Sequence, residues 1–538
     1  MAGQVSNFIP TADFFLTTLP DQFNKMKHIV IFGAGKSATS LIEYLLGQLE
    51  ENKWQLTLVD NNLSLAQSKL NNAPHAIAKA IDVENADSRA AVIHAADIVI
   101  SLLPPALHYL IARDCILFQK NLLTASYVDD KINALKDDII NNDLLFLCEM
   151  GLDPGIDHMS ALQIIHGIQR EGGIVTSFKS HCGGLVAPES DNNPWHYKIS
   201  WNPKNVVLAG KSGATFLESS RIKDMSYEEL FDAGRVVDVP EMGLFSWYPN
   251  RDSLSYIDVY KLQSAETFIR TTLRHPEFCF GWKNLIDLKL TDEHIRYQTD
   301  GMSLQQFFQQ HFNKYGFSEW IEKQLTSRFE QTKHLLEKLH ELLEAEEEAD
   351  PEAKDALQDF LMVDNTGDLK NVNLDEIKTK AAATVAGQMH EANLSMKQLF
   401  FLGMDDDTTL INLGECSAAD VLQFALEKKL ALNPDDRDMI VMLHEIEYMI
   451  QQKKYALESC LIVKGHDQLH TAMAKTVGLP LGIAAKMILQ DRIKLKGLHI
   501  PILPEIYNPI LAELSELGIS FTERILGGAQ DDKGLYFD

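Results

Sequence analysis

A glycine-rich turn constrains the fold of this chain more than any other feature. The turn Gly33-Ala34-Gly35-Lys36-Ser37-Ala38 follows a strand predicted at 28–32 and opens a helix predicted at about 36–50. In that context the spacing matches G-x-G-x-x-A. The first glycine permits a tight turn, the second lets a pyrophosphate approach the backbone, and the alanine allows the helix to pack on the strand. Unpaired N–H groups at the helix N-terminus would bind the phosphates. The turn therefore predicts a dinucleotide site.

A carboxylate in the expected place supports this interpretation. Asp60 ends the strand predicted at 55–59, where an acidic residue can bind the ribose of a dinucleotide. The turn also contains Gly-Lys-Ser, as a P-loop does. A P-loop needs a further glycine five residues before Gly35, and that position is Val30, so the P-loop interpretation is excluded.

The surrounding pattern predicts an α/β fold. Predicted strands alternate with predicted helices, which indicates a parallel sheet. The strands are expected at 28–32, 55–59, 98–102, 122–125 and 144–148. A Gly/Pro-rich turn at 151–155 then ends the alternation. We predict an N-terminal extension at 1–25 and a Rossmann-type doubly wound domain at 26–153.

The rest of the chain is predicted to form two further units. Mixed patterns at 154–300 and 431–538 predict an α/β substrate-binding domain, whose C-terminal part is also able to pack back on the Rossmann domain. Between 301 and 430 apolar residues recur at helical spacing, which predicts an inserted all-helical domain. That stripe comprises Ile321, Leu325, Phe329, Leu336, Leu339 and Leu343.

The composition limits the partners and the compartment. The 538 residues contain 76 acids against 49 Lys and Arg, a net charge of −27, which disfavours nucleic acid and anionic membranes as partners. The six cysteines show no C-x-x-C spacing, so neither a zinc knuckle nor a disulfide framework is expected. No signal sequence is recognised, and the most apolar stretch, 99–107, is far shorter than a membrane span. We expect a soluble cytoplasmic protein.

One histidine could be mistaken for a metal ligand. His158 lies on a predicted helix, but the next histidine there, His166, is eight residues away, which is not the spacing of a ligand pair on one helix face. We predict no metal.

Several longer strings resemble saccharopine dehydrogenase of the L-glutamate-forming type, also called saccharopine reductase. They are Gly151-Leu152-Asp153-Pro154-Gly155-Ile156-Asp157-His158, Cys182-Gly183-Gly184, Ala187-Pro188-Glu189, Tyr248-Pro249-Asn250-Arg251-Asp252-Ser253, Thr272-Leu273-Arg274, Asp438-Met439-Ile440-Val441-Met442 and Ala472-Met473-Ala474-Lys475-Thr476-Val477-Gly478-Leu479-Pro480. The likeness spans about 28–300 and 430–523. The family usually has Pro, Tyr and Gly where this chain has Val186, His181 and Thr271, and its helical segment is shorter. These departures bear on substrate specificity rather than on the fold.

The resemblance implies a set of site residues. Saccharopine has three carboxylates and a secondary amine, so its recognition needs fixed cations, and an arginine fork can bind a carboxylate through two hydrogen bonds. The substrate would be bound by Ser126, Tyr127, Asp153, Arg251, Thr272, Leu273 and Arg274. Beyond the glycine-rich turn, the cofactor would be contacted by Asp82, Val83, Leu103, Ala125, Ser126, Leu152, Asp153 and Pro154.

The implied reaction is oxidative cleavage of saccharopine to L-glutamate and 2-aminoadipate 6-semialdehyde, or the reverse condensation. It requires a group that accepts a proton and returns one to the leaving nitrogen. The candidates are Tyr127, Asp153 and Cys182, with Asp153 favoured because a carboxylate is unprotonated at neutral pH. Two alternatives stay open: Asp153 could instead cap the helix that starts near Ile156, and Cys182 could be a small buried filler.

The residues after the second strand favour NAD over NADP. Asp60, Asn61 and Asn62 offer a carboxylate to the ribose and no cation to a 2′-phosphate, which carries about −1.5 to −2 charges. The nearest downstream cation is Lys69, and Asp60 could alternatively turn outward to cap the next helix. We predict NAD as the preferred cofactor, with NADP possible.

Other functions are also open at this stage. A dehydrogenase of the same fold could act on another secondary amine, such as a carboxylated polyamine precursor, and a non-catalytic nucleotide-sensing protein is a further alternative. The direction of lysine metabolism in which the enzyme works does not follow from the sequence. A homodimer is possible.

Overall fold

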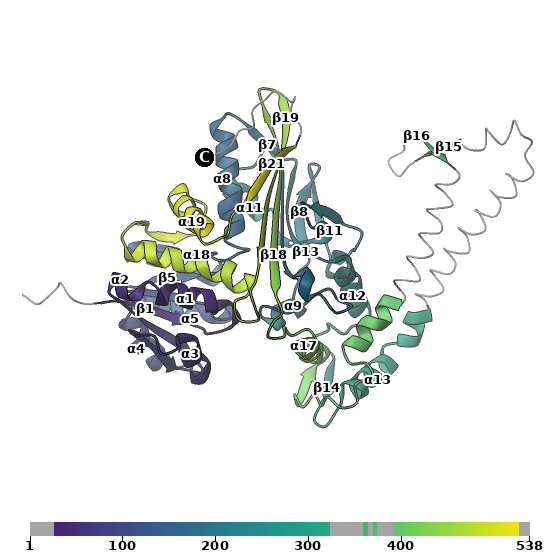
Figure 1. Ribbon diagram of the computed structural model, residues 1–538, viewed down its shortest axis with the longest axis horizontal. Coiled ribbons are helices and arrows are strands. Elements are labelled where there is room, and N and C mark those ends of the chain that lie inside the picture. Colours follow the sequence, from purple (N-terminus) through teal and green to yellow (C-terminus); the bar gives the residue numbers. More distant parts are fainter. Residues whose placement is uncertain (1–25, 323–358, 364–368, 374–390, 392, 527–538) are drawn as a thin grey trace, which may run out of the picture.

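The computed structural model in Figure 1 describes residues 26–322, 359–363, 369–373, 391 and 393–526. The predicted extension at 1–25 and most of the predicted helical stripe, from Leu325 to Leu343, lie outside these residues.

The first part of the chain builds a parallel sheet of seven strands. Its order is β20-β6-β5-β4-β1-β2-β3, and every pair is parallel. The strand sequences are short apolar runs because helices cover both faces of the sheet. Their bounds are β1 Lys27–Phe32, β2 Trp54–Asp60, β3 Ala76–Ala80, β4 Ile98–Ser101, β5 Asn121–Thr124, β6 Leu145–Leu147 and β20 Gly497–His499.

The helices between these strands complete the doubly wound arrangement. They are the 3-10 turn η1 Lys36–Ala38, then α1 Thr39–Leu46, α2 Leu49–Asn52, α3 Leu63–Leu70, α4 Ala86–His94, α5 Pro105–Leu117, α6 Asp130–Asn133 and α7 Lys136–Asn141. The glycine-rich turn therefore leads into a short 3-10 turn first, and the regular helix starts at Thr39.

The end of the chain returns to this sheet. Helix α18 (Ala472–Leu489) lies beside α1 in Figure 1, and a Cβ on Gly478 would come within 2.7 Å of the Leu41 nitrogen. Among the described residues, α18 is the one helix that could span a membrane by length and composition, yet 83% of it is buried inside the protein, as in the core helix of a globular protein. It is followed by β20 and by α19 (Pro504–Glu516), neither of which the sequence predicted.

A second sheet of ten strands forms the centre of the molecule. Its main order is β10-β11-β13-β7-β18-β19-β21, with β8, β9 and β12 attached at one side; β13 and β7 run parallel, whereas β7, β18 and β19 are antiparallel neighbours. Its strands are β7 Ile174–Val186, β8 Ala214–Glu218, β9 Arg221–Met225, β10 Val236–Val239, β11 Gly243–Pro249, β12 Arg251–Asp252, β13 Thr267–Arg274, β18 Asp438–Ile450, β19 Lys453–Lys464 and β21 Thr522–Leu526. The helices beside it are α8 Ile156–Arg170, η2 Pro188–Ser190, α9 Pro203–Val207, α10 Tyr227–Leu230, α11 Ser255–Tyr260 and α12 Pro276–Asp287.

The zone predicted as all-helical contains strands as well as helices. Helices α13 (Leu304–Lys314) and α17 (Ala418–Lys429) bury aromatic and aliphatic side chains in one core, but β17 (Glu415–Ser417) pairs with β14 (Arg296–Gln298). A second antiparallel pair joins β15 (Asp359–Val363) to β16 (Leu369–Asn373). The three-residue strands β14 and β17 are too short to show a period of two in the sequence.

Candidate active site

The glycine-rich turn has the geometry that a pyrophosphate site requires. Gly33 adopts φ +103°, which favours glycine, and a Cβ there would lie 3.1 Å from the Leu102 oxygen. Gly35 is exposed, and a Cβ on it would meet nothing within 4 Å. The space beside Gly35 is therefore open to a ligand, and Ala38 is buried against the strand, as its role in helix packing demands. The residues fit a dinucleotide.

Asp60 turns toward this loop and does not cap the next helix. Its carboxylate accepts hydrogen bonds from the Ala34 N–H at 2.8 Å and the Asn62 N–H at 2.9 Å. Asn62 is the residue that caps α3, because its side chain accepts from the Leu65 N–H at 3.1 Å. Asp60 thus lies at the glycine turn, where a ribose is bound in this type of fold.

Two lysines lie close to the same turn. Lys36 belongs to the turn itself, and the Nζ of Lys69 on α3 hydrogen-bonds to the Thr39 hydroxyl at the start of α1. Partial burial lowers the pKa of both lysines. The nearby carboxylates of Glu427 and Glu43 oppose this shift for Lys36 and Lys69, respectively.

The remaining predicted cofactor residues lie in loops after consecutive strands. Asp82 and Val83 are in the turn between β3 and α4, where Asp82 accepts from the Glu84 N–H and the Val83 oxygen accepts from Arg89. Leu103 follows β4, and Ala125 and Ser126 follow β5. The carboxyl ends of neighbouring parallel strands form the ligand crevice of an open α/β sheet.

His108 holds Ser126 in this crevice, a contact that sequence reasoning missed. One ring nitrogen of His108 lies 2.8 Å from the Ser101 hydroxyl at the end of β4, and the other lies 2.8 Å from the Ser126 hydroxyl. Burial lowers the pKa of His108 to about 4, so the imidazole is neutral at physiological pH. No motif surrounds His108 on α5, so only its position in space identifies it.

The turn before α8 presents Asp153. Gly155 adopts φ +148°, and a Cβ there would lie 2.1 Å from the Gly151 oxygen, so the turn requires glycine. Asp153 does not cap α8, because the Gly155 N–H is bound by the Asp157 carboxylate at 2.6 Å. The Asp153 carboxylate instead accepts from the Tyr127 hydroxyl at 3.3 Å.

Arg270 is the second site residue that sequence reasoning missed. Its guanidinium donates to Asp153 Oδ1 at 2.7 Å and to Asp157 Oδ2 at 2.8 Å, and the side chain is 3% exposed. It stands two residues before Thr272 on β13, so Arg270, Thr272 and Arg274 share one face of that strand. This alternation of side chains along the strand was a signal in the sequence that could have identified Arg270.

The buried carboxylates differ in proton affinity. Burial raises the pKa of Asp153 to about 6, opposed by Arg270 and reinforced by Asp157. The pKa of Asp157 is lowered, because His158, Arg270 and the Gly155 N–H outweigh the effect of burial. Burial also raises the pKa of Tyr127 and Cys182, so both carry their protons near neutral pH. Asp153 is therefore the candidate base among the three predicted groups.

Glu149 and His158 form a further buried group next to this cluster. Glu149 adopts φ +57°, unusual for a residue with a side chain, and its carboxylate binds the Val128 N–H at 3.1 Å and His158 at 2.9 Å. The other His158 nitrogen lies 2.6 Å from the Tyr260 hydroxyl. Glu149 thus fixes the loop that carries Tyr127, and both nitrogens of His158 are engaged. In the described part of the chain no three His, Cys, Asp or Glu side chains are grouped to hold a metal.

The predicted substrate residues are only partly brought together. Arg251 is exposed, and its guanidinium carbon lies 5.4 Å from the centroid of the Tyr127 ring. Cys182 pairs with Thr272 across β7 and β13. The Leu273 side chain, in contrast, points to the other face of the sheet and packs in a separate apolar cluster.

Arg274 is buried beside aromatic rings. Its guanidinium carbon lies 5.1 Å from the Tyr197 ring centroid and 5.4 Å from that of Phe278, and one nitrogen donates to the Leu273 oxygen. Its Nε has no hydrogen-bond partner among the described residues. Arg274 is thus a buried cation with unused donor capacity.

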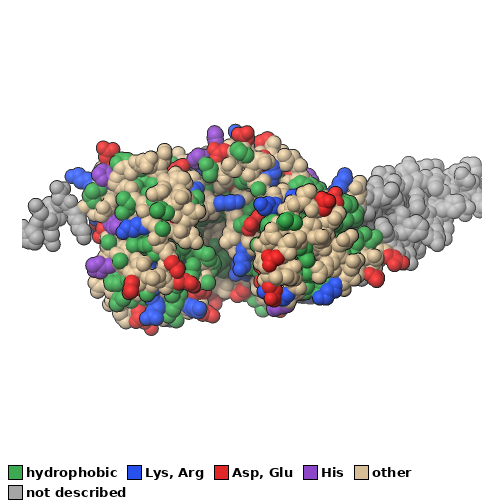
Figure 2. All heavy atoms as spheres, turned by 90° about the horizontal axis from the view of Figure 1, so that it is seen from below, with side chains coloured by type: hydrophobic (Ala, Val, Ile, Leu, Met, Phe, Trp, Pro, Cys, Tyr) green, Lys and Arg blue, Asp and Glu red, His purple; other side chains and the backbone are tan. Residues whose placement is uncertain are grey.

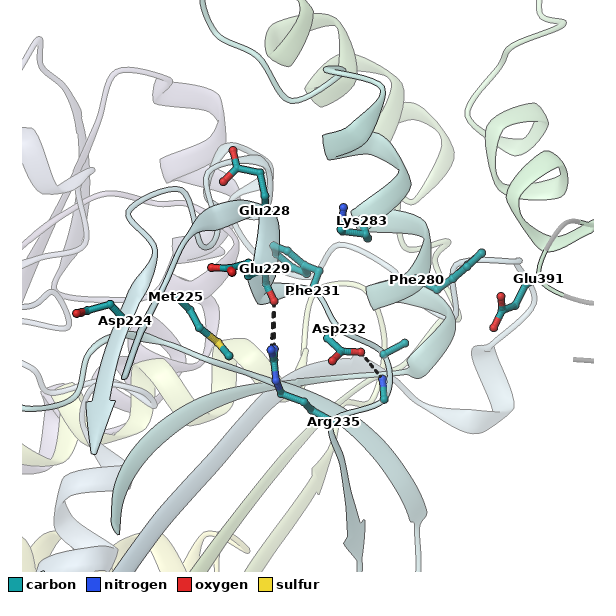
Figure 3. Close-up of a pocket in the computed structure, with 12 residues that line it drawn as sticks. Asp224, Met225, Glu228, Glu229, Phe231, Asp232, Arg235, Phe280, Lys283 and Glu391 are labelled. Carbon is teal, nitrogen blue, oxygen red and sulfur yellow. Dashed lines mark hydrogen bonds between the residues drawn. The ribbon is translucent and has the colours of Figure 1, made fainter. Parts of the chain in front are cut away.

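The surface is hollowed between the two lobes that carry the two sheets, and Figure 2 shows Lys and Arg side chains along this hollow. A separate cavity of about 660 Å³, drawn in Figure 3, contains none of the predicted site residues. Two of its polar groups are bound within the protein: Arg235 donates to the Glu229 oxygen, and Asp232 accepts from the Gly234 N–H. We therefore assign the site to the strand ends.

Comparison with known proteins is consistent with this site. Residues 29–147 match the family model described as saccharopine dehydrogenase NADP binding domain, and residues 151–519 match that of the saccharopine dehydrogenase C-terminal domain. An alpha-aminoadipic semialdehyde synthase of Arabidopsis thaliana is 29% identical over 94% of this chain, which spans only 45% of that relative. The saccharopine dehydrogenase [NADP(+), L-glutamate-forming] of Schizosaccharomyces pombe is 28% identical to this chain. The match covers 99% of that protein and 93% of this chain.

A solved structure extends the likeness to the fold. The saccharopine dehydrogenase (L-Glu forming) of Saccharomyces cerevisiae superposes with a TM-score of 0.72 at 26% identity, covering 93% of this chain and all of that one. The two family models together match most of the chain. This chain belongs to the saccharopine dehydrogenase family of oxidoreductases, in its L-glutamate-forming branch.

Proposed function

We propose that this protein catalyses the NAD-dependent oxidative cleavage of saccharopine to L-glutamate and 2-aminoadipate 6-semialdehyde. The observation that carries the proposal is the buried Asp153 carboxylate, bound by Tyr127 and Arg270 at the carboxyl ends of the strands that form the dinucleotide crevice. Oxidation of an amine by a nicotinamide requires a base beside the nicotinamide ring, because the amine must lose a proton.

The cations of the site suit a substrate with several carboxylates. Arg251 is exposed beside Tyr127, and Arg274 keeps an unused Nε donor in a buried position. An arginine can bind a carboxylate through parallel hydrogen bonds. Arg270, already bound to two carboxylates, is not available for this task.

The proton steps follow from the state of Asp153. With a pKa of about 6, Asp153 is mostly ionised at neutral pH and accepts the proton of the substrate's secondary amine. When bound, the nicotinamide supplies the hydride acceptor. The amine lone pair then forms the C=N bond as hydride leaves the ε-carbon, which gives an iminium. Water adds to that carbon and releases one proton to solvent, which gives a carbinolamine. When its C–N bond breaks, Asp153 returns its proton to the glutamate nitrogen, and the hydroxyl proton is released to solvent as the aldehyde forms.

The choice of NAD rests on the second strand. The Schizosaccharomyces pombe relative carries NADP(+) in its name, whereas this chain places Asp60 at the glycine turn, followed by the exposed, neutral Asn61 and Asn62. A 2′-phosphate there would meet a carboxylate, and a repulsion of about 2 kcal/mol would give a preference of roughly 30-fold. Lys36 and Lys69 lie close enough to the turn to offset part of it.

Spectrophotometry tests the proposal. Reduced nicotinamide should accumulate, with stoichiometric glutamate, when saccharopine and NAD are added together, and a blank without saccharopine should stay flat. A flat trace with saccharopine would refute the assignment, and a response only to another secondary amine would reassign the substrate. Measured kcat/KM for NAD and NADP decides the cofactor. Asp60→Ala should reduce the difference in kcat/KM between NAD and NADP. If the parent protein prefers NADP, the NAD assignment is overturned.

A further inference from the structure

Arg270 cannot act as a mobile substrate-binding cation. Its guanidinium carbon lies 4.5 Å from the centroid of the Tyr256 ring, and its backbone N–H donates to the buried Ser253 hydroxyl at 3.1 Å. Its backbone oxygen accepts from the Asn250 N–H at 2.8 Å. The side chain is fixed on both sides and points at Asp153 and Asp157. A cation held in this way serves the carboxylates it contacts.

The contacts of Asp153 are confined to one of its two oxygens. Arg270 and Tyr127 both bind Oδ1, at 2.7 and 3.3 Å, and no hydrogen bond from the described residues reaches Oδ2. The Asp153 side chain remains 14% exposed. One oxygen is therefore anchored inward, and the other is left to meet a substrate.

We propose that Arg270 is a positioning residue: by anchoring Oδ1 of Asp153, it presents Oδ2 as the atom that takes the proton of the reacting amine. This inference rests on the proposed function. Arg270 touches neither substrate nor cofactor in this role. It acts through Asp153, and Asp157 competes with Asp153 for the same guanidinium nitrogen.

The charged and titratable neighbours of Asp153 make this role measurable. They come from each element packed around it: Tyr127 after β5, Asp157 and His158 on α8, Cys182 on β7, Tyr260 on α11 and Arg270 on β13. Among them, Arg270 favours the ionised form of Asp153, whereas Asp157 disfavours it. Removing Arg270 and removing the charge of Asp157 should consequently shift the titration of Asp153 in opposite directions.

The experiment compares pH profiles of kcat/KM for saccharopine. Arg270→Gln should move the acidic limb upward by about one pH unit or more and lower kcat by about 10²-fold, because the base is both less ionised and misaligned. Arg270→Lys, which keeps the charge but loses the fork, should shift the limb upward by less and still lower kcat. Asp157→Asn, which can still accept the Gly155 N–H, should move the limb downward.

The control is Thr271→Val, on the same strand. The Thr271 hydroxyl contacts His181 at 2.7 Å on the opposite face of the sheet, so its loss should leave the acidic limb in place. Limbs that do not move, or that move in the same direction for Arg270→Lys and Asp157→Asn, would overturn the proposal even if Arg270→Gln fails to fold.

A second measurement needs no substrate and separates this inference from the proposed function. The Tm difference between the parent and Asp153→Asn should change around pH 6, at higher pH in the Arg270→Lys background and at lower pH in the Asp157→Asn background. If the variants show these shifts but the parent protein does not oxidise saccharopine, the proposed function is refuted and the electrostatic link between Arg270, Asp157 and Asp153 stands. Parent protein that is active but shows no shift in the variants would refute the positioning role alone.

Discussion

At the scale of single residues, the folded protein holds Asp153 in a position where its charge is unfavourable. Burial raises its pKa to about 6, above the ordinary value near 3.9 for an aspartate, although Arg270 opposes the shift. Active sites commonly contain groups whose proton affinity is tuned at the expense of stability. Tyr127 and Cys182 lie beside it but keep their protons.

This imbalance predicts a pH-dependent gain in stability for Asp153→Asn. Because the folded pKa is raised, the contribution of Asp153 is fully favourable below about pH 4 and is lost as pH rises through 6. The variant should therefore be more stable than the parent at pH 8, by up to about 3 kcal/mol, and by only about 1 kcal/mol at pH 4.5. Urea unfolding at both pH values measures the gap, while kcat should fall at least about 10²-fold. A gap independent of pH would contradict the argument.

Cys182 should tolerate substitution better than Asp153. Burial raises the pKa of its thiol well above the ordinary value, so it does not serve as a base near neutral pH. We expect Cys182→Ala to retain kcat within about tenfold and to leave the acidic limb of the pH profile unchanged. Saccharopine kinetics between pH 5 and 9 test this, and a loss comparable to that of Asp153→Asn would restore Cys182 as an acid–base candidate.

The sequence predicted site residues that lie in recognisable strings, such as Asp153 and Arg274, and missed those defined only by spatial contacts. Arg270 lies two residues outside its motif, and His108 and Glu149 stand in no motif at all. Their roles depend on contacts between segments far apart in sequence, for instance Arg270 with Asp153, which no local pattern encodes.

At the scale of elements, the turn before α8 sets the position of the base. It is closed by contacts between Gly151 and Gly155. Asp157, rather than Asp153, binds the Gly155 N–H, and the first N–H groups of the helix donate to the backbone oxygens of Gly151 and Leu152. Five of the seven strands of the parallel sheet were predicted from their apolar runs, whereas β3 and β20 were not. The strands β20, β14 and β17 have only three residues each and give no period, and β3 is not a buried apolar run. The order of strands in the ten-stranded sheet depends on long-range pairing and was not accessible from the sequence.

Gly155→Ala should disrupt this turn. At φ +148° and with its Cβ only 2.1 Å from the Gly151 oxygen, alanine cannot be accommodated without moving the backbone that carries Asp153. We expect a loss of about 3 kcal/mol or more and loss of activity. Gly172→Ala is the matched control: it also has positive φ, at +74°, but nothing lies within 4 Å, so it should cost about 1 kcal/mol. Equal losses would show that strain alone, and not the contact, decides the effect.

At the scale of the whole molecule, both ends of the described chain contribute to the dinucleotide-binding sheet. Strand β20 pairs with β6, and α18 packs on α1, the helix that follows the glycine turn. The helix that follows the turn is therefore packed against residues more than 400 positions away in the sequence. The alternation of strands and helices in 26–153 predicted the sheet, and the C-terminal part of the chain was expected to be able to pack back on it. The sequence did not identify α18 as the element that covers α1.

Gly478→Val tests whether NAD binding depends on the packing of α18 on α1. A side chain at Gly478 would meet the Leu41 nitrogen at 2.7 Å and push α18 away from α1, so NAD affinity should fall at least about tenfold, together with Tm. Lys475→Val on the same helix introduces the same β-branched residue at a half-buried position and controls for helix propensity. Calorimetry with NAD measures the affinity of both variants. An unchanged affinity in Gly478→Val would show that the packing of α18 is not needed for NAD binding at the turn.

The return of the chain to its first sheet also has a consequence for biosynthesis. The strands β1 to β6 leave the ribosome early, but the apolar surface of α1 stays uncovered until α18 and β20 have been made, some 330 to 350 residues later. At a synthesis rate of about 5–20 residues per second, that interval is roughly 20–70 s. During this time the nascent dinucleotide-binding region presents a hydrophobic face, and we expect chaperones to bind it until α18 and β20 close over it.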